Sequence, residues 1–123
     1  MILADTSIWI DHFRSPNPML IRLMQANELL MHPYVIGELA MGSIAERKLR
    51  LRLWAMLPTL SLASLEEILT LVERRRLYSR GIGFADANLL ASSLAQSGTS
   101  LWTRDRRLRD VAQELGVLAE FDP

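Results

Sequence analysis

Short apolar runs alternate with amphipathic stretches along almost the whole chain. Runs of three to five residues, each close to turn-forming or polar residues, are typical of buried strands. They lie at residues 2–4, 29–31, 60–63, 100–103 and 117–121. Between them, apolar residues recur every three or four positions and predict helices. These helices are expected from about residue 8, and at 18–24, 34–41, 45–57, 64–78, 85–96 and 107–115.

Residues that favour helix ends support several of these boundaries. Thr6 and Ser7 offer cap oxygens for the first helix, and Pro18 suits the first turn of the second. Ser64 and Glu67 have the spacing of a capping box. Strands alternating with helices predict a parallel sheet with helices on both faces. At 123 residues, without a linker or repeat, residues 1–123 are expected to form one α/β domain.

Composition excludes several kinds of chemistry. There is no cysteine, so disulfides, zinc–thiolate sites and iron–sulfur clusters are excluded, and a reducing cytoplasm is the expected location. The N-terminal segment lacks the pattern of a signal peptide, and no apolar run reaches the roughly 18–20 residues that span a bilayer. The 14 basic residues balance the 14 acidic ones, so net charge carries no nucleic-acid signature.

Four acidic residues stand where strands should end or helices begin, each beside an apolar stretch: Asp5, Glu38, Asp86 and Asp105. In a parallel sheet the carboxyl ends of the strands share one edge, so these side chains are expected to lie together. Carboxylates that converge repel each other unless a cation neutralises them, and Mg²⁺ and Mn²⁺ prefer oxygen ligands. The chemistry typical of such a site is phosphoryl transfer or phosphodiester hydrolysis.

Each acid also has an ordinary structural interpretation. Asp5 and Asp86 suit helix caps, Glu38 suits a solvated helix face, and Asp105 suits a turn beside neighbouring arginines. Placement of all four at the functional edge of one sheet favours a shared site. Asp11 lacks that placement and is interpreted as surface charge.

In four segments the chain resembles the PIN-domain ribonucleases of the VapC toxin type, from bacterial toxin–antitoxin pairs. The matching segments run in order from one end to the other: ILADTSIWID, YVIGELAMG, FADANLLASSL and LWTRDRRLRDVAQELGV. The resemblance implies a three-layer α/β/α fold with a central, mainly parallel sheet. It also implies an RNA substrate, a homodimer and inhibition by a cognate VapB-like antitoxin.

The resemblance carries over residue by residue. Asp5, Glu38, Asp86 and Asp105 match the acidic site of that family. Further matches are the hydroxyl residues that would orient these carboxylates: Thr6, Ser7 and Thr103. The hypothesis is a Mg²⁺- or Mn²⁺-dependent endoribonuclease that hydrolyses RNA to 5′-phosphate and 3′-hydroxyl ends. Asp5 would be the central ligand, with Asp86 and Asp105 beside it and Glu38 holding a second cation or orienting water.

Contacts with RNA and with a protein partner have weaker signals. Arginines flank the last acid and suit phosphate contacts, with a solvated helix face as the alternative interpretation: Arg104, Arg106 and Arg107. In the helix at 45–57, one apolar face is expected to carry Leu49, Leu53, Met56 and Leu57. Leu51 and Trp54 lie off that face. Together with Leu65, Ile68 and Leu69 they suit either the core or a groove for an antitoxin helix.

Three other functions fit parts of the pattern. A phosphoacceptor domain would need a lysine from a late strand, and the only lysine is Lys48, in the Arg-rich helix. A catalytically silent binding module of the same fold would bind no Mn²⁺. A metallonuclease acting on DNA would use the same acids, because the cation meets a phosphate in either polymer.

Overall fold

Three parallel strands form the central sheet of the computed structural model, which describes residues 1–121. They are β1 (Ile2–Ala4), β2 (Leu29–Leu30) and β3 (Ser100–Trp102), in the order β2-β1-β3. Leu3 of the central strand pairs with Leu30 on one side and Leu101 on the other. The predicted parallel sheet is therefore confirmed. The predicted domain end at residue 123 lies outside the described residues.

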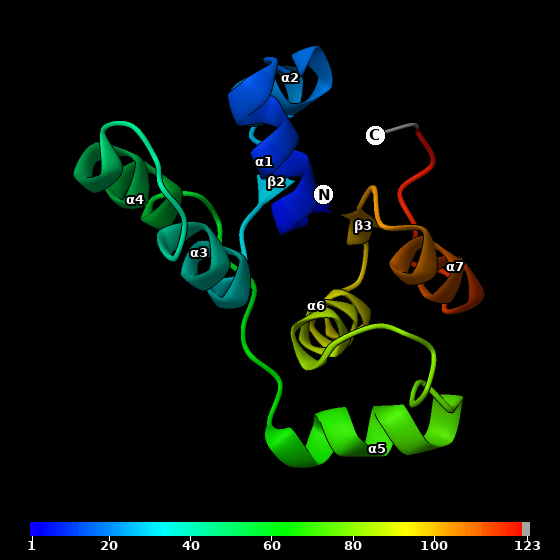
Figure 1. Cartoon of the computed structure of the whole chain (residues 1–123). Helices are drawn as coiled ribbons and strands as arrows, with labels where there is room; N and C mark the ends of the chain where they lie inside the picture. Colours follow the sequence, from blue (N-terminus) through cyan, green and yellow to red (C-terminus); the bar gives the residue numbers. More distant parts are fainter. Residues whose placement is uncertain (122–123) are drawn as a thin grey trace.

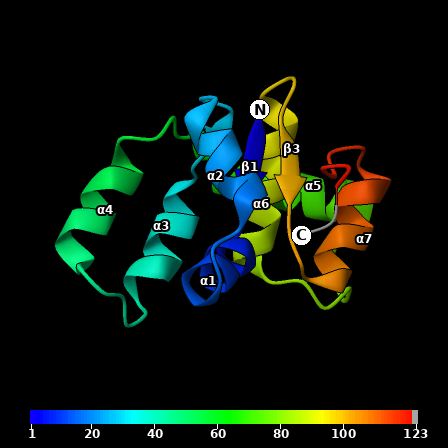
Figure 2. The ribbon, with the colours of Figure 1, turned by 90° about the horizontal axis from the view of Figure 1, so that it is seen from above.

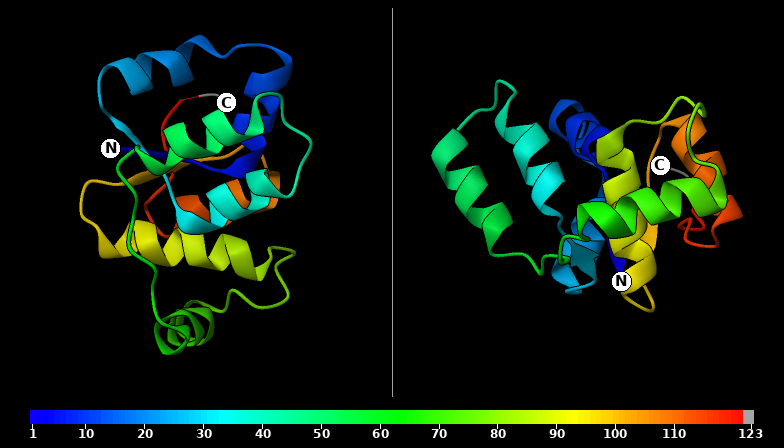
Figure 3. Two further views of the ribbon diagram at one scale, coloured as in Figure 1. Left: turned by 90° about the vertical axis from the view of Figure 1, so that its left-hand side faces the viewer. Right: turned by 90° about the horizontal axis from the view of Figure 1, so that it is seen from below.

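Helices cover both faces of this small sheet. They are α1 (Thr6–Arg14), α2 (Pro18–Gln25), α3 (Pro33–Ala40), α4 (Arg47–Ala55), α5 (Leu65–Arg75), α6 (Phe84–Ala95) and α7 (Arg106–Glu114). Figures 1 and 3 show α2 on one side of the strands, with α6 and then α5 on the other. Figure 2 shows α3 and α4 side by side at one flank, and α7 at the opposite flank. Within residues 1–121 no helix is long and apolar enough to cross a bilayer.

The strands are buried on both faces, which explains why they read as continuous apolar runs. Leu3, Ala4 and Leu101 have no solvent exposure. Helix α6 is buried on two sides because it lies between the sheet and α5. Its small residues Ala87 and Ala91 pack against Ile68 of α5. This close packing fixes the position of α6, and therefore of the acid near its N-terminus.

Two of the five predicted strands are wrong. The segment at 60–63 forms no strand: the bridge to Met31 is made by Thr59 just before it, and Leu60 donates one backbone hydrogen bond to Met31. The segment at 117–121 makes only one bridge, between Leu101 and Leu118. Both segments carry buried side chains, Leu60 being only 2% exposed. Their apolar character therefore reports burial beside the sheet edges, not continued strand pairing.

The apolar face predicted for the Arg-rich helix is not the face that the protein buries. Leu49, Leu53 and Met56 are 46%, 51% and 77% exposed, whereas Trp54 is 5% exposed. The Trp54 ring packs against Trp9 of α1, with ring centroids 5.8 Å apart. The largest side chain of α4 therefore sets which face turns inward, because it removes the most apolar area from water.

Helix caps agree with the sequence in one place and differ in another. The capping box of Ser64 and Glu67 is confirmed at the start of α5. At α1 the predicted caps are wrong, because Thr6 and Ser7 already belong to the helix and Asp5 is the N-cap. The helix thus begins directly after β1, which leaves Asp5 at the junction between strand and helix.

Candidate active site

The four predicted acids lie at the edge of the sheet where β1 and β3 end; we call them the acid edge. Asp5 follows β1 and caps α1, while Asp105 follows β3 and caps α7. Asp86 stands in the first turn of α6, and Glu38 lies on α3. Their burial differs: Asp5 is 6% exposed, Asp86 is half-buried, and the other two are exposed.

Asp5 is the most enclosed member of the acid edge, and hydrogen bonds reach both of its carboxylate oxygens. Oδ1 accepts from the Ser7 hydroxyl at 2.5 Å and from the Ile8 backbone N–H at 3.3 Å. Oδ2 accepts from the Thr103 hydroxyl at 2.5 Å. Burial raises the pKa of Asp5, and these hydrogen bonds lower it in part. Its environment thus orients the carboxylate while leaving its charge poorly solvated.

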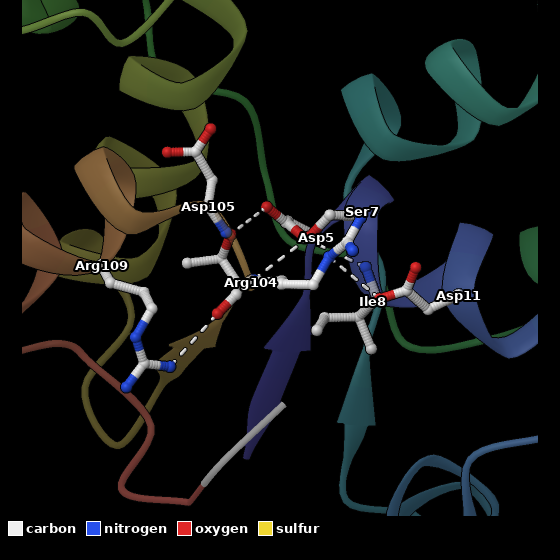
Figure 4. Close-up of polar contacts among 8 residues, drawn as sticks. Asp5, Ser7, Ile8, Asp11, Arg104, Asp105 and Arg109 are labelled. Atoms are coloured by element: carbon white, nitrogen blue, oxygen red, sulfur yellow. Dashed lines mark hydrogen bonds and ion pairs between the residues drawn. The ribbon is translucent and has the colours of Figure 1, made fainter.

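Two hydroxyl groups join the ends of β1 and β3 around Asp5 (Figure 4). Thr103 Oγ1 donates to Asp5 and accepts from the backbone N–H of Asp105 at 3.1 Å. Ser7 Oγ donates to Asp5 and accepts from the backbone N–H of Arg104 at 3.2 Å. Each hydroxyl therefore ties the loop after β3 to the carboxylate after β1, which fixes the spacing of the two strand ends.

Glu38 reaches the acid edge from α3, on the flank opposite to α7 (Figure 2). Its Oε1 accepts from the Thr6 hydroxyl at 2.6 Å. Thr6 is adjacent to Asp5 in the chain, so this bond holds α3 against the start of α1. The residues expected to orient the carboxylates, Thr6, Ser7 and Thr103, thus each donate to one of the acids.

Asp86 is affected by the charges of two other acids of the edge. Burial raises its pKa, and the negative charges of Asp105 and Glu38 raise it further, while the backbone N–H of Gly83 lowers it. That N–H donates to Asp86 Oδ2 at 2.9 Å. The charges of Glu38, Asp86 and Asp105 therefore act on a common region, although they come from three different helices.

The carboxylates are gathered but not yet arranged as a set of ligands. In residues 1–121 no three acidic or histidine side chains are placed to hold one ion, and none of the four acids forms an ion pair. Asp86 is turned back to Gly83, and Asp105 Oδ1 accepts from the Leu108 N–H at 3.0 Å. Uncompensated negative charge on an all-oxygen donor set fits a hard divalent cation, which these side chains would reach by rotating out of their caps.

The arginines around Asp105 differ in what they contact. Arg104 Nε lies 3.0 Å from Asp11 Oδ2 on α1, so Asp11 belongs to an ion pair at the rim of the site. Arg107 lies over Gly81, where an added Cβ would stand 2.5 Å from Nη1. Arg106 is exposed. A surface cleft of about 300 Å³ is lined by Ser7, Arg104 and Asp105.

Asp11 is the residue of this region that the sequence did not single out. The sequence pattern indicates surface charge there: Asp11 closes the segment ILADTSIWID, but nothing in that segment marks it as a partner of Arg104. Its partner Arg104 is distant along the chain, so only the folded arrangement of α1 and β3 brings them together. The alternative pairing of Asp105 with a neighbouring arginine is not seen in residues 1–121.

Comparison with known proteins identifies the fold and the family. A family model described as PIN domain matches residues 2–114. The chain belongs to the PIN-domain family. The crystal structure of PAE2754 from Pyrobaculum aerophilum superposes with a TM-score of 0.63 at 20% identity, covering 89% of this chain and 83% of that one. At that identity the likeness supports the fold alone.

Relatives found by sequence show which kind of PIN-domain protein the chain is. The protein Ribonuclease VapC32 from two strains of Mycobacterium tuberculosis, CDC 1551 / Oshkosh and ATCC 25618 / H37Rv, is 49% identical over 121 residues. The match covers 98% of this chain and 98% of each relative. Within the PIN-domain family, this chain is therefore of the VapC type, as its motifs predict.

Proposed function

We propose that this chain is a Mg²⁺- or Mn²⁺-dependent endoribonuclease that acts as the toxin of a VapBC-type toxin–antitoxin pair. The observation that supports it best is the acid edge: four carboxylates from separate segments lie around two strand ends, and none of them has a basic partner within residues 1–121. The names of the relatives as ribonucleases support the choice of RNA.

The roles follow from position and burial. Asp5 would be the central ligand, because it is the most buried acid and its orientation is fixed by Ser7 and Thr103. Asp86 and Asp105 would complete the site from α6 and α7. Glu38, oriented by Thr6, would hold a second cation or orient the water that attacks the phosphate.

The cation supplies the chemistry that the side chains lack. When bound, it lowers the pKa of water and offsets negative charge on the scissile phosphate. The protein offers no pair of histidines for attack by the ribose 2′-hydroxyl, since His32 is fully buried and His12 pairs with the backbone of Asn17. We therefore expect hydrolysis to leave 5′-phosphate and 3′-hydroxyl ends.

The remaining assignments extend the same proposal. Arg104, Arg106 and Arg107 would contact RNA phosphates beside the acid edge. The chain would form a single domain over residues 1–123 and a homodimer. It would be inhibited by a VapB-like antitoxin and would act in the cytoplasm. The absence of cysteine from the sequence supports the location, because it is compatible with a reducing compartment.

The test is a cleavage assay on matched RNA and DNA oligonucleotides with Mn²⁺, using wild type and Asp5→Asn. Loss of the central ligand should slow RNA cleavage by at least about 100-fold, because even residues that only support ligands contribute about 10–100-fold. Asp110→Asn, the same change at an exposed position of α7, should cleave at close to the wild-type rate.

Other outcomes would assign a different function. Cleavage by Asp5→Asn at the wild-type rate would contradict the site. Equal cleavage of DNA would favour a DNA-directed metallonuclease, and no cleavage together with no Mn²⁺ binding would favour a silent binding module.

A further inference from the structure

An ion pair crosses the rim of the acid edge. Arg104 extends from the end of β3 toward α1, where its Nε lies 3.0 Å from Asp11 Oδ2 (Figure 4). Both side chains are solvent-accessible, with exposed fractions of 58% and 34%. The pair thus belongs to the weak class of surface salt bridges, which break and re-form easily.

The two ends of Arg104 are held differently. Its backbone N–H donates to Ser7 Oγ, which itself donates to Asp5, so the main chain is fixed to the centre of the site. Its guanidinium is attached to α1 through Asp11 alone of the acids in residues 1–121. The side chain also lines the cleft that contains Ser7 and Asp105. A fixed backbone with an exposed guanidinium gives a group that can exchange partners without moving the strand ends.

A phosphate entering this cleft meets an unfavourable field. The carboxylates of the acid edge repel it, and Asp11 offsets the positive charge of Arg104, which lines the cleft. A phosphate matches the planar fork of arginine and accepts two parallel hydrogen bonds. It would therefore compete with Asp11 for the same guanidinium.

Building on the proposed function, we infer that Asp11 is a built-in competitor of the RNA backbone. In the free protein Asp11 holds the Arg104 guanidinium against α1. When single-stranded RNA binds, a phosphate next to the scissile one takes Arg104 from Asp11. Asp11 thus weakens RNA binding and favours RNA whose backbone places a phosphate within reach of Arg104. The residues proposed to hold the cation keep their positions.

The experiment measures binding apart from cleavage. Fluorescence anisotropy with a short, labelled, mixed-sequence single-stranded RNA, in EDTA and at low salt, gives Kd for wild type, Asp11→Asn, Arg104→Gln and the double variant. Asp11→Asn should lower Kd by about two- to fivefold, the range that exposed ion pairs allow. Arg104→Gln should raise Kd, and in its background Asp11→Asn should have little further effect.

A control separates this exchange from a simple change of net charge. Glu28→Gln removes one exposed negative charge just before β2, at the opposite end of the strands, and should leave Kd within the error of wild type. Raising the salt concentration should shrink the Asp11→Asn effect, because surface ion pairs are screened.

The outcomes that overturn the inference are distinct from those that overturn the proposed function. If wild type cleaves RNA but Asp11→Asn binds it no more tightly, or improves binding equally in the Arg104→Gln background, the competitor role is wrong. If Asp11→Asn instead weakens binding and lowers Tm, the pair is a structural tie. If wild type neither binds nor cleaves RNA, both proposals fail.

Discussion

Two groups of polar side chains lie within this fold, and they are built on opposite principles. One is the acid edge, at the ends of β1 and β3. The other, which we call the His32 cluster, joins His32 before α3, Ser92 on α6 and the backbone of Ser61. The His32 cluster carries no net charge and pairs its polar groups inside the protein. The acid edge concentrates like charges that have no basic partner in residues 1–121.

The His32 cluster is a chain of satisfied hydrogen bonds. His32 has no solvent exposure, and its Nδ1 accepts from the Tyr34 backbone N–H at 3.0 Å as the cap of α3. Nε2 lies 3.0 Å from Ser92 Oγ, which donates to the carbonyl of Ser61 at 2.9 Å. Because the Ser92 hydroxyl donates its proton to Ser61, it must accept from Nε2, which therefore carries the ring proton. Nδ1 accepts from Tyr34 and is unprotonated, so the imidazole is neutral. Burial accordingly lowers the pKa of His32 to about 4.

The comparison separates polar groups that stabilise the fold from polar groups kept for chemistry. Paired, uncharged groups stabilise a core, because no donor or acceptor loses its partner on burial. The raised pKa of Asp5 and of Asp86 shows that their charged forms are disfavoured by the fold. Such strain is typical of functional sites, where activity is retained at some expense of stability.

The largest expected effect on folding comes from breaking the His32 cluster. His32→Ala removes the cap of α3 and the bond to Ser92 and leaves a cavity, so the free energy of unfolding should fall by about 3 kcal/mol. RNA cleavage per folded molecule should stay unchanged below the new Tm. Urea denaturation and the cleavage assay measure the two quantities.

A matched variant distinguishes the cap from the rest of the cluster. Asn is a good N-cap but is too short to reach Ser92, so His32→Asn should destabilise the protein by only about half as much. Equal destabilisation by both variants would show that the cap contributes nothing. A selective loss of cleavage in either would contradict the separation of the two groups.

An effect smaller than that of His32→Ala is expected from pH, with opposite signs for the two groups. His32 has a depressed pKa in the folded protein, so stability is complete above about pH 6.5 and falls as protons bind the unfolded state, down to about pH 4. Between pH 7 and pH 5 the loss should be about 2 kcal/mol. Asp5 and Asp86 have raised pKa values, so their protonation stabilises the fold as pH falls through those values.

His32 should therefore contribute most of the change in the free energy of unfolding with pH. Urea denaturation at several pH values should show a clear loss from pH 7 to pH 5 in wild type and a much smaller one in His32→Asn. The pKa of His12 is also lowered, by burial and by the charge of Arg50, and leaves a minor slope of the same sign. An unchanged slope in His32→Asn would contradict this assignment.

Sequence patterns were sufficient for the parts of the fold that repeat a simple rule. The strand at 2–4 and the start of α5 follow from an apolar run and a capping box. The apolar runs at 60–63 and 117–121 predict strands that do not form, because burial beside a sheet gives the same pattern as burial within it. The face of α4 that is buried depends on the packing of Trp54 against Trp9, a contact between distant parts of the chain.

For the site, the sequence indicated which acids share an edge but not how they are held. Sheet topology alone places the residues that follow β1 and β3 together. The hydroxyl bonds of Ser7 and Thr103, and the pairing of Asp11 with Arg104, join segments nearly the full chain apart. No local pattern encodes such pairs, because their partners are brought together only by folding.

The central claim is that the uncompensated charge of the acid edge serves to bind a divalent cation. Calorimetric titration of the purified protein with Mn²⁺ tests it without any RNA. The account predicts saturable binding to wild type and to Asp110→Asn, and binding weakened by more than about tenfold in Asp5→Asn. Equal Mn²⁺ affinity in wild type and Asp5→Asn, with both proteins folded, would contradict it.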